Sequence, residues 1–508
     1  MQHGDAAGSG LYDQHGKLNL VKESARRTAG TITLLGWLAV RAVAADPMAL
    51  TTDVKVTAPT PPNPNLLNDW LRNQSPAWQQ LDLGGQLRLR YNDQEKAGAF
   101  PNNDFVGNAA TNSNAELLTR ITGHMGYTPV NGLTLLAAGR VSLESGDKRQ
   151  PSPDASNLDL YQAYLRLGDL KEFPVQLQVG RQELTYGDLR WVSNSDWNNN
   201  GRRFDAAKLR FENSFGWLDA FISHPVYVDR DHPDKWNQYE YFSGLYAASK
   251  QLVPWQETQV YFLSYNVGAN SPSVTTPTAT GPSARDIYTY GTLMKSLPGQ
   301  LRGWDYSIEL TGQTGSLTTN ATKGSRLDLR ACSTFDSVGY TFEQAWATPR
   351  LGLGYEFGSG DDNPKDGTVG TIQNLFGYNH RFYGTMDLFG MRNMHIPRIS
   401  GSLAPAKDFK FTADYLFFWL DDTNDYLYPE TAAARTQNGY GIHPNFNSYV
   451  GSELDLIANY TVRAWRNLQV GYGHFFVGDY IKESLATVPA DGKAVDADWV
   501  YTQVTLNF

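Results

Sequence analysis

The sequence predicts an all-β protein, a transmembrane antiparallel β-barrel of about 18 strands with short turns at one end and long loops at the other. Three observations predict this fold. Apolar and polar residues alternate along most of the chain, the connections between these segments are by turns long and short, and the last segment ends on an aromatic residue. A chain of 508 residues is long enough for one large barrel.

Alternation with a period of two begins near Leu83. In LGGQLRLRY (83–91) the leucines share one face, and Arg88 and Arg90 fall on the other. The same pattern recurs in LTRITGHMGY, LTLLAAGRVSLE and DFKFTADYLFFW. Neighbouring side chains of a strand point to opposite faces, so these segments are predicted to be strands with one apolar and one polar face. The weakest strand is the one near 396–403, because Pro397 interrupts its hydrogen-bonding ladder.

The connections between these segments alternate strictly in length. Short ones such as TPVNG and ENSFG are each followed by a long one such as ESGDKRQPSPDASN. Strict alternation places all tight turns at the same end of the barrel. It predicts short periplasmic turns and long extracellular loops, as in an outer-membrane barrel.

The last residues, WVYTQVTLNF, form an amphipathic segment that ends at Phe508. A terminal strand of this kind resembles the assembly signal of bacterial outer-membrane barrels. It implies that the barrel assembly machinery and outer-membrane lipid are partners. A soluble β-sandwich or propeller is the alternative fold.

The N-terminal region carries an export signal. Basic residues precede the apolar run TITLLGWLAV (31–40), and Ala42-Val43-Ala44 fits a signal-peptidase site. We therefore assign 1–44 to a signal peptide, whose first 20 residues suggest a start codon placed too far upstream. The Pro- and Thr-rich stretch that follows makes 45–80 a periplasmic linker with one short helix near its end, and the barrel occupies 81–508. A buried helix is the alternative for the apolar run. No later segment has the roughly 18 apolar residues of a membrane-spanning helix.

Several classes of function are disfavoured. The single cysteine, Cys332, excludes an intrachain disulfide and a multi-cysteine metal site. A net charge of −9 argues against nucleic-acid binding. No nucleotide-binding or hydrolase motif occurs, and no cofactor or metal is expected. DDNPKDG and DDTNDY are candidates for Ca²⁺ binding, but solvated loop acids are favoured over them. Four histidines are expected at the surface: His224, His232, His380 and His443.

The candidate site is the stretch GRQELTYGDLRWVSNSDWNNNGRRFDAAKLRF (180–211). Arg181 ends one strand, and Lys208 and Arg210 lie on the polar face of the next, so the loop between them starts and finishes at the pore mouth. Arginine matches a carboxylated sugar because its planar fork binds a carboxylate at two points.

Within this loop the acids are expected to hold the arginines in place. We expect Asp188, Asp196 and Asp205 to fix Arg190, Arg202 and Arg203, and we expect Trp191 and Trp197 to stack on sugar faces. The alternative is that these charges only pack the loop into the lumen.

The same stretch resembles the signature region of the alginate-export family of outer-membrane barrels. The matching residues are Gly180-Arg181-Gln182, Gly187-Asp188, Arg190-Trp191, Trp197, Gly201-Arg202 and Phe204-Asp205-Ala206. A second resemblance is FGYNHRFYGTMDLFGMRN (376–393). The resemblance runs from about residue 80 to 508. It implies an outer-membrane channel without catalytic residues, and it does not fix the solute.

The polar faces of the strands separate by charge along the chain. Those of the first six strands carry the cations Arg88, Arg90, Arg120, Arg140, Arg166, Lys208 and Arg210. Those of later strands carry the acids Asp305, Glu309, Glu343, Glu356, Asp414, Glu453 and Asp455. One interpretation is a transverse field that selects a charged or polar solute. The alternatives are chance, or mutual neutralisation across a plugged lumen.

The sequence thus predicts a channel in the bacterial outer membrane that passes an anionic or polar saccharide or another small solute. A general porin without preference is the rival within the fold. A soluble, exported carbohydrate-active enzyme is the rival from another class, but it needs paired carboxylates facing one cleft.

Overall fold

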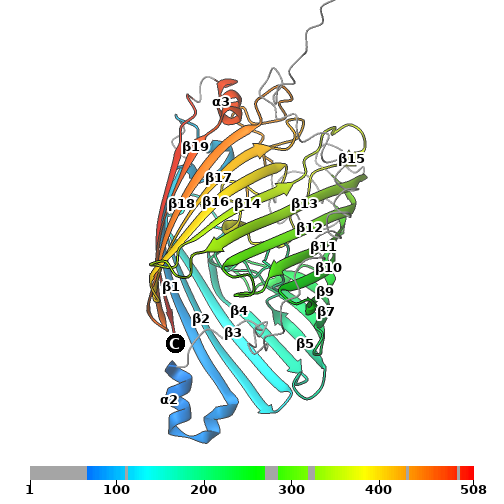
Figure 1. The fold of residues 1–508 in the computed structure, drawn as a ribbon, viewed down its shortest axis with the longest axis vertical. Coiled ribbons are helices and arrows are strands. Elements are labelled where there is room, and N and C mark those ends of the chain that lie inside the picture. The colour runs from blue at the N-terminus through cyan, green and yellow to red at the C-terminus, as the bar shows by residue number, and fades with distance from the viewer. Residues whose placement is uncertain (1–65, 109–111, 269–283, 319–325, 431–433, 489–491) are drawn as a thin grey trace, which may run out of the picture.

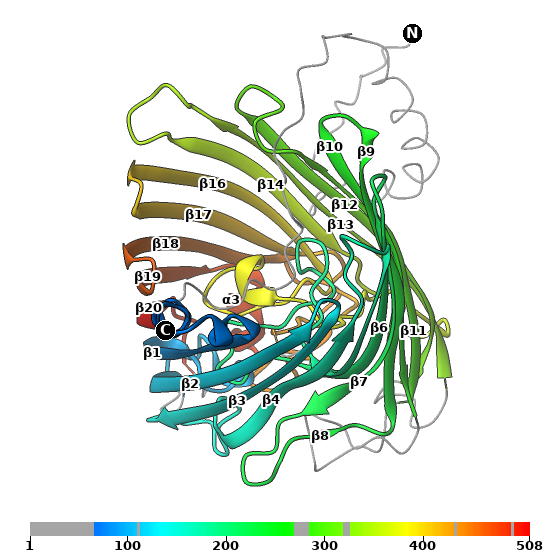
Figure 2. The ribbon, with the colours of Figure 1, turned by 90° about the horizontal axis from the view of Figure 1, so that it is seen from below.

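The computed structural model describes residues 66–108, 112–268, 284–318, 326–430, 434–488 and 492–508. The predicted signal peptide, 1–44, lies outside these ranges. In the described part of the chain, 18 antiparallel strands form a closed barrel, which confirms the predicted fold (Figures 1 and 2). The barrel strands are β1 (Leu81–Gly98), β2 (Ser113–Val130), β3 (Leu133–Ser145), β4 (Ser156–Leu167), β5 (Val175–Gln182), β6 (Phe204–Glu212), β7 (Trp217–Tyr227), β9 (Glu240–Val253), β10 (Gln256–Val267), β11 (Arg285–Ser296), β12 (Trp304–Thr318), β13 (Arg326–Thr341), β14 (Arg350–Gly358), β16 (Met394–Ala406), β17 (Phe409–Leu420), β18 (Tyr449–Arg463), β19 (Arg466–Val477) and β20 (Ala497–Asn507).

The barrel closes between its first and last strands. β1 pairs antiparallel with β20, from Gln86 opposite Asn507 to Glu95 opposite Asp498. Each other wall strand pairs with the wall strand that follows it in the chain. Two short strands, β8 (Lys235–Trp236) and β15 (Thr368–Val369), lie within long loops. The helices in the described ranges are short: α2 (Leu66–Gln74), α3 (Asp479–Ala486), η1 (Pro76–Gln80), η2 (Pro101–Asn103) and η3 (Asn379–Arg381). None of them has the length and apolarity needed to cross a membrane.

The alternation of the strands sorts their side chains between the outer surface and the interior. On β1, Leu89 is exposed while Arg88 and Arg90 are buried. On β2, Ile121 and Met125 are exposed and Arg120 is buried. The outer surface is therefore an apolar band, which is the surface that a barrel presents to lipid.

Pro397 lies inside β16 and is accommodated by a local gap in the ladder. It pairs with Tyr355 of β14. Toward β17, pairing is interrupted between His395 and Arg398 and resumes in the same register. Proline lacks a backbone N–H, so the ladder loses its bond on one side only, and the strand survives.

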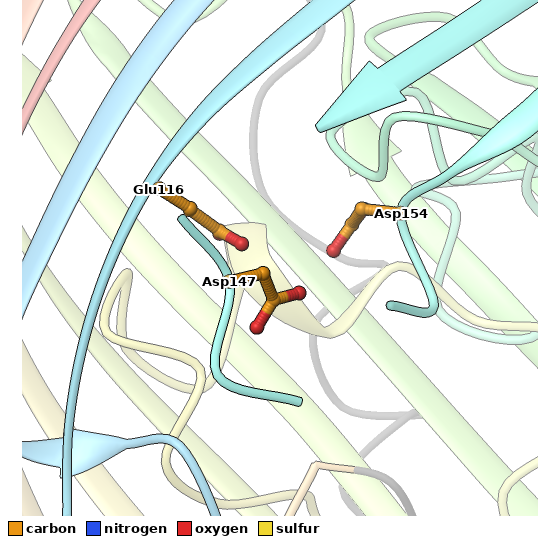
Figure 3. Close-up of side chains that lie close together, drawn as sticks. All are labelled: Glu116, Asp147 and Asp154. Carbon is orange, nitrogen blue, oxygen red and sulfur yellow. The ribbon is translucent and has the colours of Figure 1, made fainter. Parts of the chain in front are cut away.

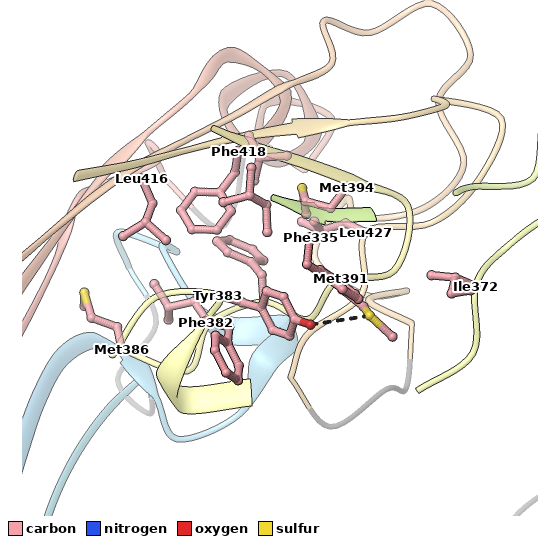
Figure 4. Packing of buried hydrophobic residues seen from close by; sticks show 14 of the residues in the cluster. Phe335, Ile372, Phe382, Tyr383, Met386, Met391, Met394, Leu416, Phe418 and Leu427 are labelled. Atoms are coloured by element: carbon pink, nitrogen blue, oxygen red, sulfur yellow. Dashed lines mark hydrogen bonds between the residues drawn. The ribbon is translucent and has the colours of Figure 1, made fainter. Parts of the chain in front are cut away.

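The interior of the barrel is filled over much of its height. Two long connections fold into it: the first inward loop, 183–203, joins β5 to β6, and the second inward loop, 359–393, joins β14 to β16. Their apolar residues form one buried cluster with inward residues of the wall. Figure 4 shows Phe382, Met386 and Met391 of the second inward loop packed with Leu416 and Phe418 of β17. The expectation of a polar interior thus fails where the loops enter, because wall residues that face a loop need not meet water.

Candidate functional site

The two inward loops are joined to each other across the lumen. The Ser193 N–H donates to the Phe376 carbonyl (2.8 Å), and the Phe376 N–H donates to the Trp191 carbonyl (2.9 Å). The Trp197 ring stacks on the His380 ring at a centroid distance of 3.7 Å. The loops therefore form one constriction rather than two independent flaps.

Four buried arginines of β1, β2 and β3 hold the first inward loop. Arg88 donates to the Asp196 carbonyl (2.6 Å) and the Trp197 carbonyl (2.9 Å). The other three donate to the carbonyls of 196, 197 and 200 at 2.8–3.0 Å. We call these residues the cationic wall: Arg88, Arg90, Arg120 and Arg140. Their guanidinium groups supply the donors that the carbonyls of an irregular loop need when it leaves water.

Asn199 lies at the centre of this attachment and is fully buried. Its side-chain amide donates to the carbonyls of Thr119, Leu143 and Asp154 at 3.1–3.3 Å. Its side-chain oxygen accepts from Arg88, and its main-chain oxygen accepts from the Ser142 hydroxyl (3.0 Å). One asparagine thus ties the loop to the walls of β2 and β3 and to the β3–β4 loop.

The second inward loop is held by carboxylates of β18, which β19 and β20 separate from β1 of the cationic wall. Glu453 accepts the Met386 N–H (2.9 Å), and Asp455 accepts the Thr385 N–H (3.1 Å) and hydroxyl (2.5 Å). Gly384 has a φ of +93°, and a Cβ there would lie 2.5 Å from the Glu453 carboxylate oxygens. The approach therefore requires glycine.

A third attachment joins the first inward loop both to the barrel wall and to the second inward loop. Arg190 of the first inward loop binds Glu356 of β14 at two points, 2.5 and 2.9 Å, and its guanidinium lies 3.5 Å from the centre of the Phe382 ring. Arg398 of β16 shares the same carboxylate at 3.5 Å. We call Glu356, Glu453 and Asp455 the acidic wall. All three are buried.

The charge pairs expected inside the first inward loop are wrong. Asp188 pairs with Lys295 (2.8 Å) and accepts from the Ser307 hydroxyl (2.9 Å). Asp196 pairs with Arg120 (2.9 Å), and Arg203 pairs with Asp234 of the β7–β9 connection. Arg202 donates to the carbonyls of 376 and 377. The loop crosses the lumen, so its charged side chains reach the walls and neighbouring loops before they reach one another.

Asp196 stays ionised because of its neighbours. Enclosure in the barrel raises the pKa of its carboxyl, but Arg120, Arg88 and Arg140 outweigh this effect and lower the pKa to about 2. Its side chain is 58% exposed, so the carboxylate also meets lumen water.

Arg181 and Asp205 do not line the lumen. They pair with each other (2.8 Å) in adjacent strands. Gln182 and Phe204, their chain neighbours, are buried inside, and Val179, two residues before Arg181, is exposed. Alternation therefore places both charged side chains on the outer side of the barrel, which corrects the predicted position at the pore mouth. The predicted position relied on Arg181 standing at the end of its strand and did not consider which face of the strand its side chain occupies.

Neither tryptophan offers a free face to a sugar. Trp191 is buried and donates its indole N–H to the Thr311 hydroxyl (3.1 Å). Trp197 lies between the His380 ring and the Arg90 guanidinium, which is 3.6 Å from its ring centre. The stacking expected with a solute is thus made with protein groups. His380 is itself buried, so the surface position expected for it is wrong.

Lys208 and Arg210 point inward, as their place on β6 predicts, and both approach Asp219 of β7 (3.9 and 2.6 Å). Their side chains keep 22% and 17% exposure. Nearer the short turns, Arg350 and Asp305 pair at 2.5 Å and stay 30% and 40% exposed. Inward residues are thus more exposed toward the short-turn end, where the inward loops do not reach.

A polar pocket of about 190 Å³ lies where the inward loops meet the wall of β12, β13 and β16. It is lined by Asp188, Arg190, Ser307, Glu309, Phe335, Asp336, Ser337, Phe382 and Arg398. Two of these residues, Asp188 and Arg190, belong to the predicted site. Sequence reasoning missed Arg398, which shares a strand with Pro397, and it missed Asn199 inside the run WNNNG. The only available signal for Asn199 was the density of amides in that run.

One acidic cluster is neutralised by an arginine of the protein. Glu116, Asp147 and Asp154 lie close together near the β3–β4 loop (Figure 3). Arg149 contacts all three at 2.9–3.2 Å and supplies the positive charge. In the motifs DDNPKDG and DDTNDY, Asp361, Asp422 and Asp425 are buried and accept main-chain N–H groups. The expectation of solvated loop acids is therefore wrong for these three residues.

A family profile, described as alginate export, matches residues 79–490. The chain belongs to the alginate export family. Its match covers both inward loops and most of the barrel. No curated protein sequence matches the chain.

Solved outer-membrane barrels share the fold of this alginate export family member at low sequence identity. OpdK from Pseudomonas aeruginosa has a TM-score of 0.53 at 13% identity, over 84% of this chain and 98% of that chain. OccK9 (OpdG) from the same organism has a TM-score of 0.55 at 13% identity, over 85% and 99%. A BenF-like porin from Pseudomonas fluorescens Pf-5 has a TM-score of 0.52 at 10% identity, over 85% and 99%. The protein is an outer-membrane channel.

Proposed function

We propose that the protein is a passive channel for small anionic or polar solutes, including saccharides of one or two units. The observation that carries this proposal is the constriction. Two inward loops, one held by the cationic wall and the other by the acids of β18, leave a polar pocket of about 190 Å³ beside Arg190 and Arg398. Pockets that hold drug-sized ligands have about 300–1,000 Å³. The size of the pocket therefore favours small solutes over a polysaccharide chain.

The charges favour contacts at the pocket rather than a field across the whole lumen. The guanidinium groups of the cationic wall donate to loop carbonyls, and the β18 acids accept loop N–H groups. These wall groups are therefore engaged with the protein rather than with a solute. Arg398, by contrast, has an ion pair of only 3.5 Å and no hydrogen bond among the described residues. A guanidinium with open donors at a pocket suits an acceptor such as a carboxylate or a hydroxyl.

This arrangement disfavours the two rivals. A general porin needs a wide aqueous path, and here the lumen is packed with buried aromatic residues at the level of the loops. A carbohydrate-active enzyme needs two carboxyl groups facing a substrate cleft. Glu453 and Asp455, two residues apart on β18, are buried against loop backbone. The acids at the pocket already have partners: Asp188 pairs with Lys295, Glu309 accepts from the Tyr261 hydroxyl, and Asp336 accepts from the Thr334 hydroxyl. We propose a conduit without catalytic residues. A solved structure shows OpdK, one of the similar barrels, with vanillate, and a small carboxylate of that kind is a reasonable test solute.

Swelling of proteoliposomes tests the proposal. Vesicles that contain the purified barrel are placed in iso-osmotic glucose, glucuronate or a trimer of uronic acid. We expect swelling with the two monomers and almost none with the trimer. Equal rates for monomer and trimer would support a wide general porin. Swelling no faster than that of empty vesicles would refute the channel.

We also propose that the barrel assembly machinery recognises the terminal strand. Phe508 closes the seam: its N–H and carbonyl exchange hydrogen bonds with Gly85 at 3.0 and 2.8 Å. Deleting Phe508 should lower the amount of heat-modifiable barrel in the outer membrane. Unchanged levels would show that assembly reads another signal.

A further inference from the structure

The short helix α2, just before the barrel, is attached by its polar side. Asn68 donates to the Asp82 carboxylate (2.7 Å) and accepts the Leu83 N–H (2.8 Å) at the start of β1. Arg72, one turn later, donates to the Leu81 carbonyl (3.3 Å). Residues four apart lie on one side of a helix, so Asn68 and Arg72 define the side of α2 that faces the barrel.

The apolar residues of α2 lie on a different side. Successive residues are about 100° apart around a helix, which places Leu66, Leu67, Trp70 and Leu71 in one stripe, roughly opposite Asn68 and Arg72. Trp70 is 58% exposed and Leu66 is 47% exposed. A helix on a soluble protein turns its apolar stripe toward the protein and its polar side to water. In α2 this arrangement is reversed.

The stripe adjoins the lipid-facing surface: Leu67 lines a shallow apolar hollow together with Leu83 of β1 and the exposed Met125 of β2. Figure 1 shows α2 beside the C-terminal end of the chain and level with the short-turn ends of β2 and β3. Trp78, just after α2, is 38% exposed, and Tyr127 and Val130 at the end of β2 are 39% and 61% exposed. Tryptophan and tyrosine gather where a membrane meets water, since one part of the ring is apolar and another is polar.

We propose that α2 is an interfacial helix whose stripe of Leu66, Leu67, Trp70 and Leu71 inserts into the periplasmic leaflet of the outer membrane. The partner is the phospholipid surface itself. Apolar side chains then enter the boundary between head groups and acyl chains, the docking side holds β1, and Asp69 and Asn73 remain toward water. The inserted helix then holds the start of β1 at the membrane–water boundary, at the same level as Trp78 and Tyr127. This inference rests on the location of the barrel in the outer membrane and not on the solute that it passes.

Spin labelling of the full-length barrel in phospholipid bilayers tests this orientation. In a Cys332→Ser background, single cysteines replace Trp70 or, as a matched control one residue away, Asp69. The label at position 70 should be several-fold more accessible to dissolved oxygen, which enters lipid, than to a nickel chelate, which stays in water. The label at position 69 should show the opposite preference. Preference for the nickel chelate at both positions would overturn the proposal.

Shielding of the position 70 label from both reagents would also overturn it, because the stripe would then be covered by protein. Heat-modifiable mobility confirms that each labelled barrel is folded. Should the label unfold α2, Trp70→Phe gives a second measurement. Phospholipids brominated near the head group quench tryptophan on contact, and the wild type should lose more fluorescence than Trp70→Phe. Equal quenching would contradict insertion.

Discussion

The two walls of the lumen perform the same task with opposite chemistry. The cationic wall donates to the carbonyls of the first inward loop, and the β18 acids of the acidic wall accept N–H groups of the second. A peptide unit has one donor and one acceptor, so a loop that leaves water can be held from either side. The separation of charge along the chain therefore matches the polarity of loop backbone, and it need not serve as a field for the solute.

The walls differ in their access to water. Asp196, the acid facing the cationic wall, has a side chain that is 58% exposed. Glu453 and Asp455 are buried and contact backbone rather than a cation. Breaking a contact therefore has different consequences at the two walls, because water can replace a lost partner only where it can enter.

The largest effect is expected at Glu356 of the acidic wall. Changing Arg190 to Met removes the bidentate partner of a buried carboxylate and leaves only Arg398, 3.5 Å away, so the cost should approach the about 3–5 kcal/mol of a broken buried pair. Denaturant unfolding in detergent measures the change. The matched control is Arg350→Met, whose pair with Asp305 is 30% and 40% exposed and which should cost under about 1 kcal/mol. Equal losses would show that burial does not distinguish the two pairs.

The cationic wall is tested through Asn199. Asn199→Leu leaves three carbonyls without their donor in a fully buried place, at about 1–3 kcal/mol for each unpaired group. The first inward loop should then leave the wall, and single-channel conductance should rise. Asn198 is its exposed neighbour, so Asn198→Leu should conduct as the wild type does. Unchanged conductance in folded Asn199→Leu would mean that this loop does not limit the path.

The preference of the channel for anions or cations should depend on the positively charged side chains that are exposed to water in the lumen. Lys295→Glu changes the charge beside the pocket by two units, at a side chain that is 34% exposed. After screening by salt, we expect an effect on the order of 1 kcal/mol, roughly a five-fold shift of the permeability ratio toward cations. The shift should grow as salt is lowered. Arg181→Glu, on the outer side, should leave the reversal potential unchanged, and a shift there would return Arg181 to the lumen.

The smallest effect is a dependence on pH. The pKa of Asp196 is lowered to about 2 in the folded barrel, compared with about 3.9 for an unperturbed aspartate. A lowered pKa contributes stability above pH 4 that is lost as pH falls toward 2. Single-channel records should therefore show more frequent opening of the constriction below pH 4. Asp196→Asn should remove this dependence, and its persistence would assign the titration to another group.

The regular parts of the barrel were predictable because their signals are local. Alternation in segments such as LGGQLRLRY predicts strands. The lengths of connections such as TPVNG predict that all the tight turns lie at the same end of the barrel. The strand that contains Pro397 was also expected, since one missing N–H leaves the rest of its ladder intact. The stretch 180–211 was identified correctly as unusual.

The roles of individual residues within that stretch were not predictable. Arg190 pairs with a residue 166 positions away in the chain, and the second inward loop reaches Asp455 across 70 positions. A signal was present in YLFFWL (415–420), where alternation gives way to a continuous apolar run. Such a run indicates a strand buried on both faces, so it marks the wall where a loop enters the lumen.

The sequence by itself determined the closed barrel and, for most strand residues, which side chains face inward, because these follow from a period of two and from the lengths of the connections. Only the tertiary structure decided what the inward charges bind. Many of their partners are backbone groups of loops that fold into the lumen. Every residue carries the same N–H and carbonyl, apart from proline's missing N–H. A backbone partner therefore cannot be recognised from the residue type at its position. Packing in three dimensions decides which of the possible partners is used.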